Sequence, residues 1–454
     1  MFRSRADAEL TAKLHARVPV LIEERSGDQG GDTNPWGISF QTQFHMSNDS
    51  DHFRTPQALE AEGWSREGTD WLREADAGLE RRVPLYEAKM IHHFDHRWAT
   101  YAGGSVDDEE GARDCTLAEK QNPAFEPVPR YWVPESEVKL RAARVPSSLK
   151  RGLREENADR VLKSLAEWLS GYFAAIEGHA MREADLTRIL GCGQAWRSSL
   201  GASPDRFLLG PKTQANGAQM QRETPLTTED IAFLTDGHDD PLALAVALID
   251  RKQPRWLMGW RRNARTTDER TWIASALAKV GIGDSIFLWT CATANAAQLS
   301  ALISAFSSYV ADFAARQKVG GTNLSFYFIQ QFPVLSPSAF TPADLAFLAP
   351  RVLELTYTSH AMRARAEDLG HSGPPFTWDE DRRARLRAEL DAFFARKYGL
   401  TRDELRYVLD PADAKGAEYP SETFRVLKTK EEARYGEYRT QRLVLEAFDQ
   451  LAGM

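Results

Sequence analysis

The stretch QKVGGTNLSFYFIQQFPV, from Gln317 to Val334, joins a polar turn to an alternating aromatic segment that ends at a proline. Gly320 and Gly321 permit backbone conformations that other residues rarely adopt. The polar side chains beside them can donate hydrogen bonds to phosphates or to base edges, which indicates contact with DNA. The alternative is a hairpin or helix-to-strand turn whose polar residues face water. The stretch by itself leaves both interpretations open.

The segment from Asp250 to Trp272 is basic and carries interleaved tryptophans. Guanidinium groups bind phosphates bidentately and read guanine edges, and aromatic rings can stack on exposed bases, so the segment indicates nucleic-acid binding. The alternative is a β-hairpin with its tryptophans in the core and its arginines in solvent. The residues concerned are Arg251, Lys252, Arg255, Arg261, Arg262, Arg265 and Arg270, with Trp256, Trp260 and Trp272.

Composition limits the possible functions. The net charge of −8 over 454 residues argues against a protein that coats nucleic acid indiscriminately, although a local basic face stays possible because charges are screened over about 8 Å. Cys115, Cys192 and Cys291 are widely spaced and form no CxxC motif, which indicates neither a disulfide framework nor a zinc site. With no long apolar run and no apolar signal sequence, the chain is predicted to be cytoplasmic.

The periodicity of apolar residues predicts an α+β fold with a helical C-terminal region and no Rossmann methyltransferase domain. Residues 213–223 are predicted to be a loop, and residues 242–249 fit either a helix or a strand. Strands are expected near residues 34–46 and 286–290. Helices are predicted over residues 6–22, 64–79, 159–175, 269–280, 293–316, 342–362, 379–397 and 429–451.

Several catalytic motifs are missing from the sequence. No Gly-Lys pair occurs, which excludes a P-loop, and the pairs Gly191/Gly193 and Gly281/Gly283 follow helical patterns, unlike a Rossmann methyl-donor site. The fragments NPWG (34–37) and NPAF (122–125) resemble only superficially the Asn-Pro-Pro-aromatic turn of amino-group methyltransferases. Glu87-Ala88-Lys89 is a fragment of a nuclease pattern without a convincing upstream Asp. We therefore predict no catalytic residue in this chain.

A cluster of histidines and an aspartate follows that fragment. His92, His93, Asp95 and His96 are residue types that can bind a divalent ion, but hydrogen-bonding or interface roles are favoured for them. No metal site is predicted.

Several longer phrases, spread over nearly the whole chain, resemble the C-terminal part of large DNA adenine-N6 methyltransferases of type IIG restriction-modification and DISARM-type phage-defence systems. The phrases are LTAKLHARVPVLIEE, NPWGISF, MSNDSDHFRT, PLYEAKMIHHFDHRWATY, PRYWVPESEV, NARTTDERT, ARQKVGGTNLSFYFIQQFPVL and EARYGEYRTQRLVLEAFD.

The resemblance implies that residues 1–148 form a connector after a missing methyltransferase domain, 149–337 a target-recognition domain and 338–454 a helical C-terminal region. In that family the catalytic domain binds S-adenosylmethionine, so no cofactor is expected in this chain. The implied partners are duplex DNA and a methyltransferase catalytic domain or subunit, with Lys89, His96 and Arg97 near the junction. The predicted DNA contacts are Arg261, Arg262, Arg265, Gln317, Lys318, Thr322 and Asn323.

Two alternatives from other classes stay open. One is a self-sufficient metal-dependent nuclease that uses Glu87, Lys89 and the histidine cluster. The other is a non-enzymatic interaction protein whose helical C-terminal region docks partners and whose basic segment is ordinary surface.

Overall fold

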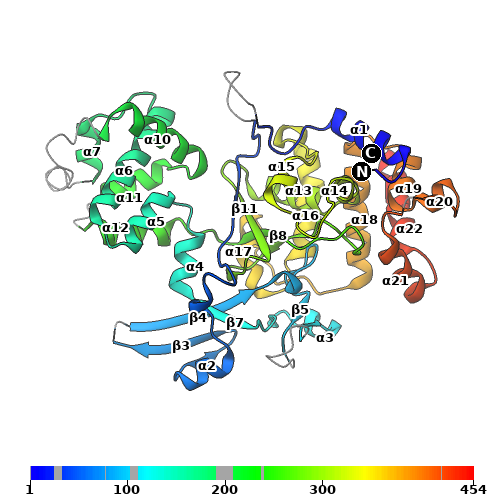
Figure 1. The fold of residues 1–454 in the computed structure, drawn as a ribbon, viewed down its shortest axis with the longest axis horizontal. Helices are drawn as coiled ribbons and strands as arrows, with labels where there is room; N and C mark the ends of the chain where they lie inside the picture. Colours follow the sequence, from blue (N-terminus) through cyan, green and yellow to red (C-terminus); the bar gives the residue numbers. More distant parts are fainter. Residues whose placement is uncertain are drawn as a thin grey trace. The chain divides into compact units, whose positions relative to one another are not determined.

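The computed structural model describes residues 2–24, 33–76, 78–102, 111–190, 208–236, 240–420 and 422–453 (Figure 1). It has the predicted α+β architecture with a helical C-terminal region. The chain forms two compact units, Met1–Val133 together with Arg255–Met454, and Pro134–Pro254. These units do not coincide with the three segments that the resemblance implies.

The first unit contains a four-stranded antiparallel sheet with the order β1-β11-β8-β9. Its inner strands are apolar and buried, and Gly259 in β8 permits their close approach because a Cβ there would lie 2.7 Å from Cγ2 of Ile286. The strands are β1 (Ile38–Gln41), β8 (Leu257–Arg261), β9 (Ala274–Leu277) and β11 (Ile286–Cys291).

The prediction of a helix over residues 269–280 is wrong. Residues Ala274–Leu277 form β9, all four are buried, and they pair with β8. The helical spacing of apolar residues is uninformative here because every position is buried, so hydrogen bonding to β8 decides the conformation. Gly281 lies in β10 and the chain continues into β11, so no helix follows this glycine pair as a Rossmann turn would require. Gly191 and Gly193 lie outside the described residues.

A second sheet has the order β10-β4-β3-β2, with β7 also paired to β4. The pairs β2–β3 and β3–β4 are antiparallel, and β10–β4 is parallel. A third, two-stranded sheet pairs β5 (Ala99–Thr100) with β6 (Arg113–Asp114). The strands of the second sheet are β2 (Ser65–Glu67), β3 (Asp70–Ala75), β4 (Gly78–Tyr86), β7 (Tyr131–Pro134) and β10 (Gly281–Ile282).

The predicted helix through Trp64, Trp71 and Leu79 is also wrong. Only the short α2 (Pro56–Ala61) is helical here, while Trp71 lies in β3 and Leu79 in β4. Gly63, Gly68 and Gly78 have positive φ values, so turns replace a continuous helix.

Small-residue helices pack against the first sheet. The predicted helix over residues 293–316 is interrupted at Ser308, whose hydroxyl accepts a hydrogen bond from the N–H of Ala311 (3.2 Å) and begins a second helix. The aromatic segment forms a short helix rather than a strand. The elements are α13 (Ala296–Ser307), α14 (Tyr309–Lys318) and α15 (Phe326–Gln330).

The C-terminal region is helical, as predicted, and shares one hydrophobic core with α1 (Arg5–Arg17), the first sheet and α13. The last predicted helix is divided in two at Gly436, which has a φ of 75°. The helices are α16 (Pro342–Thr356), α17 (Arg363–Asp368), α18 (Glu380–Lys397), α19 (Arg402–Leu409), α20 (Pro411–Lys415), α21 (Arg425–Tyr435) and α22 (Arg439–Gln450). Among the helices that the structure describes, none is both long and apolar enough to cross a bilayer.

The second unit is helical throughout its described residues and has its own core. Residues 213–223, predicted as a loop, lie in a helix whose buried positions are Thr213, Gly217 and Gln221. The helices are α4 (Glu135–Ala142), α5 (Ser147–Arg154), α6 (Ala158–Tyr172), α7 (Glu183–Leu190), α10 (Pro211–Glu223), α11 (Thr228–Thr235) and α12 (Pro241–Arg251), with a π-helical turn at Phe173–Glu177.

Candidate nucleic-acid interface

Two of the segments that the sequence indicates for DNA contact lie side by side in the first unit. The N–H of Ala264 donates to the carbonyl of Thr322 (3.1 Å), and the N–H of Leu324 donates to the carbonyl of Arg262 (2.7 Å). Asn263 and Asn323 form an antiparallel bridge between these bonds. The structure thus joins the middle of the basic segment to the glycine-containing turn.

The outer face of this junction is polar and exposed. We call it the polar edge, and its members are the exposed residues Asn263, Arg265, Gly320, Gly321, Thr322 and Asn323. A Cβ added at either glycine would meet nothing within 4 Å, so the backbone there is open to a large ligand. Arg265 supplies a guanidinium group, and the two asparagines supply paired donors and acceptors. The edge can therefore contact both phosphates and bases.

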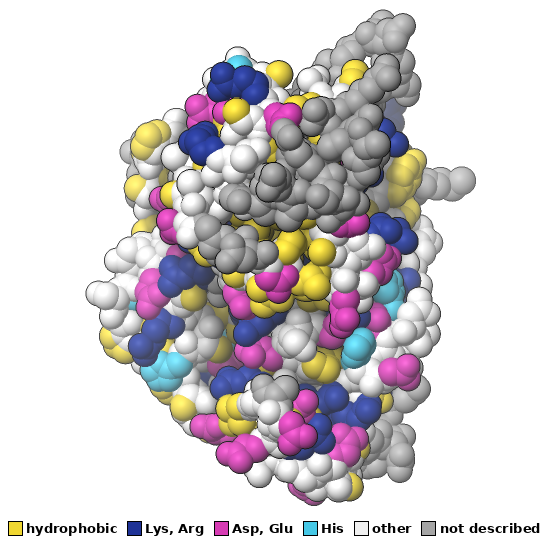
Figure 2. Space-filling view, turned by 90° about the vertical axis from the view of Figure 1, so that its left-hand side faces the viewer, with side chains coloured by type: hydrophobic (Ala, Val, Ile, Leu, Met, Phe, Trp, Pro, Cys, Tyr) yellow, Lys and Arg dark blue, Asp and Glu magenta, His cyan; other side chains and the backbone are white. Residues whose placement is uncertain are grey.

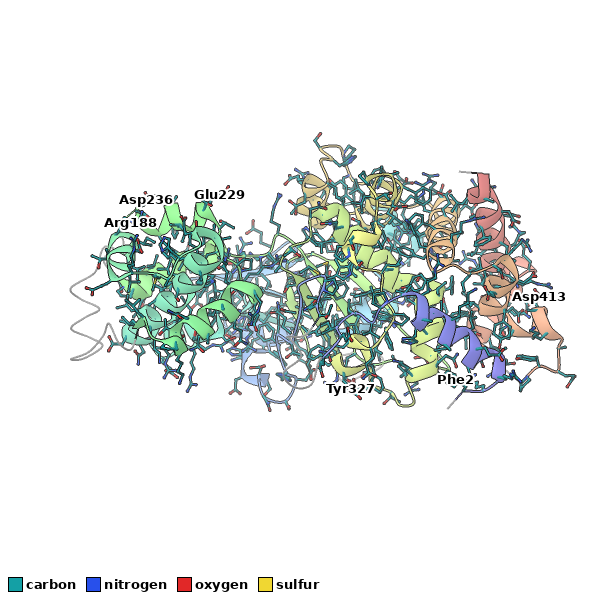
Figure 3. All side chains as sticks on the ribbon, turned by 90° about the horizontal axis from the view of Figure 1, so that it is seen from above. Phe2, Arg188, Glu229, Asp236, Tyr327 and Asp413 are labelled. Atoms are coloured by element: carbon teal, nitrogen blue, oxygen red, sulfur yellow. The ribbon has the colours of Figure 1, made fainter. Side chains whose placement is uncertain are left out.

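Tyr327 follows the polar edge in α15 with 66% of its surface exposed. Figure 3 labels its side chain at the margin of the molecule in that view. An exposed aromatic ring can stack on a base. Neither Tyr327 nor Asn263 was among the predicted contacts. Asn263 stands in the phrase NARTTDERT, and Tyr327 stands in the alternating aromatic segment that follows the glycine-containing turn.

The remaining predicted DNA contacts are half-buried, and three of their side chains form ion pairs or hydrogen bonds with other residues of the protein. Arg262 pairs with Asp284 (3.1 Å), and Lys318 donates to the carbonyl of Gln331 (2.9 Å). Arg261 donates from Nε to the carbonyl of Ile91 (2.9 Å), and burial lowers its pKa to about 10. Gln317 is half-buried at the end of α14. We infer that these residues shape the polar edge more than they touch a ligand.

The tryptophans of the basic segment belong to the core, as the alternative interpretation expected. Trp260 and Trp272 have no exposed surface, and Trp256 retains 7%. Nε1 of Trp260 donates to the carbonyl of Leu324 (3.0 Å), which ties β8 directly to the stretch from Gln317 to Val334. The three tryptophans are therefore not available to stack on bases.

A buried aspartate in α14 holds the loop that leads from the polar edge to β9. Asp312, with no exposed surface, accepts hydrogen bonds from Nε of Arg270 (2.8 Å) and from the N–H groups of Thr271 and Trp272 (each 3.0 Å). Arg316 donates to the carbonyls of residues 266, 268 and 269 from the same helix. Burial by itself would lower the pKa of Arg270, but Asp312 and its neighbours outweigh it and raise that pKa. The loop is fixed by charge-assisted bonds.

Asp391 in α18 lies beside this network and yields a test of pH dependence. Burial raises the pKa of Asp391 to about 7, although Arg270, Arg387 and the N–H of Tyr309 favour its ionised form. The folded state therefore keeps a proton that the unfolded chain loses near pH 4, and the stability contributed by this group falls as pH rises from about 4 to 7. We expect Asp391→Asn to raise the free energy of unfolding by about 2 to 4 kcal/mol at pH 8, and little at pH 4, in urea titrations. An equal gain at both pH values would contradict this.

The predicted junction residues have different environments. Lys89 is exposed, whereas His96 and Arg97 are buried inside the first unit. Nε2 of His96 lies 3.1 Å from Oγ of Ser359 and 3.3 Å from Oε2 of Glu126. Arg97 donates to the carbonyls of residues 120, 122, 125 and 358. Both residues tie the segment after β4 to the rest of their own unit.

The residues of the nuclease alternative have separate partners. Asp95 pairs with Lys120 (2.8 Å), and Glu87 lies 3.9 Å from Arg130. Within the described ranges, no three histidine, cysteine or acidic side chains are grouped so that they could hold a metal ion. The geometry lends no support to metal-dependent cleavage by these residues.

Charges of both signs are mixed on the face that Figure 2 displays, where lysines and arginines lie among aspartates and glutamates. This mixture agrees with the modest net charge of −8 over 454 residues. No protein-family model, no curated protein and no solved structure matches this chain.

Proposed function

We propose that this protein recognises duplex DNA through the polar edge, as the target-recognition part of a site-specific DNA adenine-N6 methyltransferase. The observation that carries the proposal is the pairing of residues 262–264 with residues 322–324. Two segments that were selected separately for their chemistry share one exposed edge. The resemblance to restriction-modification and phage-defence methyltransferases supports the same function.

The chemistry of the polar edge suits DNA. Arginine binds a phosphate or a guanine edge bidentately, and asparagine pairs with the N6 and N7 atoms of adenine. Open glycine backbone lets a phosphate approach closely, because no side chain stands in the way. Tyr327 can stack on a base that leaves the helix. Binding through so few charged groups is expected to be strongly sequence-dependent.

Methyl transfer is assigned to a partner. In the proposed assembly a catalytic domain or subunit binds S-adenosylmethionine and receives an adenine that is flipped out of the duplex. This protein holds the duplex in the register that presents that adenine. We assign none of its own residues to the methyl-transfer step.

The test is duplex binding by the purified chain across a salt series, with a random-sequence library and sequencing of the retained fraction. We expect a short motif containing adenine to be enriched, and affinity to fall with a shallow slope as salt rises, because the polar edge offers few cations to phosphates. A correctly folded preparation that retains no sequence preference at any salt concentration would refute recognition by this chain.

Single substitutions measure the contributions of Arg265 and Asn323 to DNA binding separately. Arg265→Ala is expected to weaken binding to the selected site about 10- to 100-fold, and Asn323→Ala to relax the preference at one base pair, with about 1 to 3 kcal/mol lost per contact. Arg385→Ala is the matched control, because Arg385 is also an exposed arginine of the first unit but lies in α18. Fluorescence anisotropy with the selected duplex measures all three. Equal losses for Arg265→Ala and Arg385→Ala would show that only general charge matters.

A further inference from the structure

A cavity of about 320 Å³ lies within the first unit, apart from the residues of the polar edge. It is lined by the segment after β4 and by parts of α14, α18, α21 and α22. Its volume falls at the lower end of the range typical of small-molecule sites. The lining residues include His93, Lys120, Arg383, Arg387 and Asp391.

His93 is the most unusual side chain in this cavity. Only 3% of it is exposed, and neither Nδ1 nor Nε2 has a hydrogen-bond partner among the described residues. A buried polar group without a partner is costly, and its presence at a cavity wall indicates a missing ligand group. Burial, followed by the nearby Arg270, lowers the pKa of His93 well below its ordinary value. A bound anion would reverse that effect.

The cavity lining carries charges of both signs, but two of its arginines, Arg383 and Arg387, form no ion pair among the described residues. The guanidinium of Arg383 is buried and donates to two carbonyls, of Leu355 (2.7 Å) and Phe94 (3.2 Å), while Asp95 is shared with Lys120. Arg387 is exposed at the cavity and has no hydrogen bond or ion pair among the described residues. This arrangement repels a metal cation and attracts an anion.

Asp391 forms no ion pair with either guanidinium group. Its carboxylate accepts a hydrogen bond from the N–H of Tyr309 (2.8 Å) and faces Arg387 without forming an ion pair. With a pKa raised to about 7 by burial, it exists partly as the neutral acid near physiological pH. A neutral carboxylic acid can donate a hydrogen bond to an anionic oxygen.

We propose that this cavity binds a phosphate group, held by the Arg387 and Arg383 guanidinium groups and by a ring nitrogen of His93. Arginine offers a phosphate two parallel N–H donors, and the imidazole adds a third donor from inside the cavity. The volume leaves room for the small molecule that carries the phosphate. The proposal is independent of DNA recognition by the polar edge.

The probes are inorganic phosphate and a nucleoside monophosphate, titrated into the full chain by isothermal calorimetry. We expect saturable binding, weakened at least tenfold by Arg387→Ala and unchanged by Arg385→Ala, a neighbouring exposed arginine that does not line the cavity. Both substitutions are at exposed positions of α18, so folding is expected to survive them. Tighter binding of the nucleotide would identify a phosphate ester as the ligand, and equal binding would identify free phosphate.

Histidine side-chain NMR provides a second measurement. Binding of phosphate is expected to shift the ring signals of His93 and to raise its pKa, and the shift should be absent in Arg387→Ala. Arg385→Ala should leave the histidine shift unchanged, because Arg385 does not line the cavity. No binding at millimolar phosphate, equal affinity in the Arg387→Ala and Arg385→Ala variants, or unmoved histidine signals would each overturn the proposal.

Discussion

Replacing Asp312 by alanine is expected to destabilise the first unit by about 3 to 5 kcal/mol, because it leaves a buried guanidinium without its counter-charge. Arg270 is 6% exposed and pairs with Asp312 at 2.8 Å. Two backbone N–H groups of residues 271 and 272 lose their acceptor at the same time. Urea denaturation followed by tryptophan fluorescence measures the loss.

Asp413→Ala is the control for that experiment. Asp413, labelled in Figure 3, also pairs with an arginine, but its side chain and that of Arg406 are 38% and 39% exposed. An exposed pair contributes at most about 1 kcal/mol. Unfolding of both alanine variants at the same urea concentration would contradict the prediction that the buried Asp312 pair stabilises the protein more than the exposed Asp413 pair.

Replacing Gly171 by alanine is expected to force α6 and α10 apart in the second unit. A Cβ at Gly171 would lie 1.9 Å from the carbonyl oxygen of Gly217, and one at Gly217 would lie 2.2 Å from that of Glu167. Both contacts are with backbone, so no side-chain rotation relieves them. We expect a loss of about 3 kcal/mol or more, the upper end of what overpacking costs, measured by thermal and urea unfolding.

Ala215→Val is the control for the helix pair. Ala215 lies in α10 but is exposed, so added methyl groups meet solvent and only helix propensity changes, by less than about 1 kcal/mol. A Gly171→Ala variant as stable as the Ala215→Val variant would show that the two helices can separate without loss of packing.

Residue type alone did not show which of the predicted DNA contacts are exposed in the folded protein. Arg265, Thr322 and Asn323 are exposed in the polar edge, as a contact surface requires. Arg261 was chosen for its charge, yet its guanidinium donates to the carbonyl of Ile91. Residue type shows what a side chain can do, while its partners depend on segments that are distant in the sequence.

The histidine cluster illustrates the same limit. The sequence favoured hydrogen-bonding or interface roles for His92, His93, Asp95 and His96. The sequence did not separate His96, which contacts Ser359 and Glu126, from His93, whose ring nitrogens have no partner among the described residues. That difference arises because Ser359, 263 positions later in the sequence, contacts His96, whereas His93 lines the cavity.

The sequence by itself determined the α+β class, the helical C-terminal region and the long helices α6, α16 and α18. Apolar residues at spacings of three and four fall on one face of a helix, so a helix is the conformation that buries them together. The tertiary structure decided β9 and the hairpin of β3 and β4, since a short or wholly buried segment satisfies its backbone only through a neighbouring strand. It also decided the polar edge, where two loops acquire a common surface through hydrogen bonds between residues 262–264 and 322–324. Local spacing carries no information about pairing at such a separation, which is why the candidate site emerged only from the folded chain.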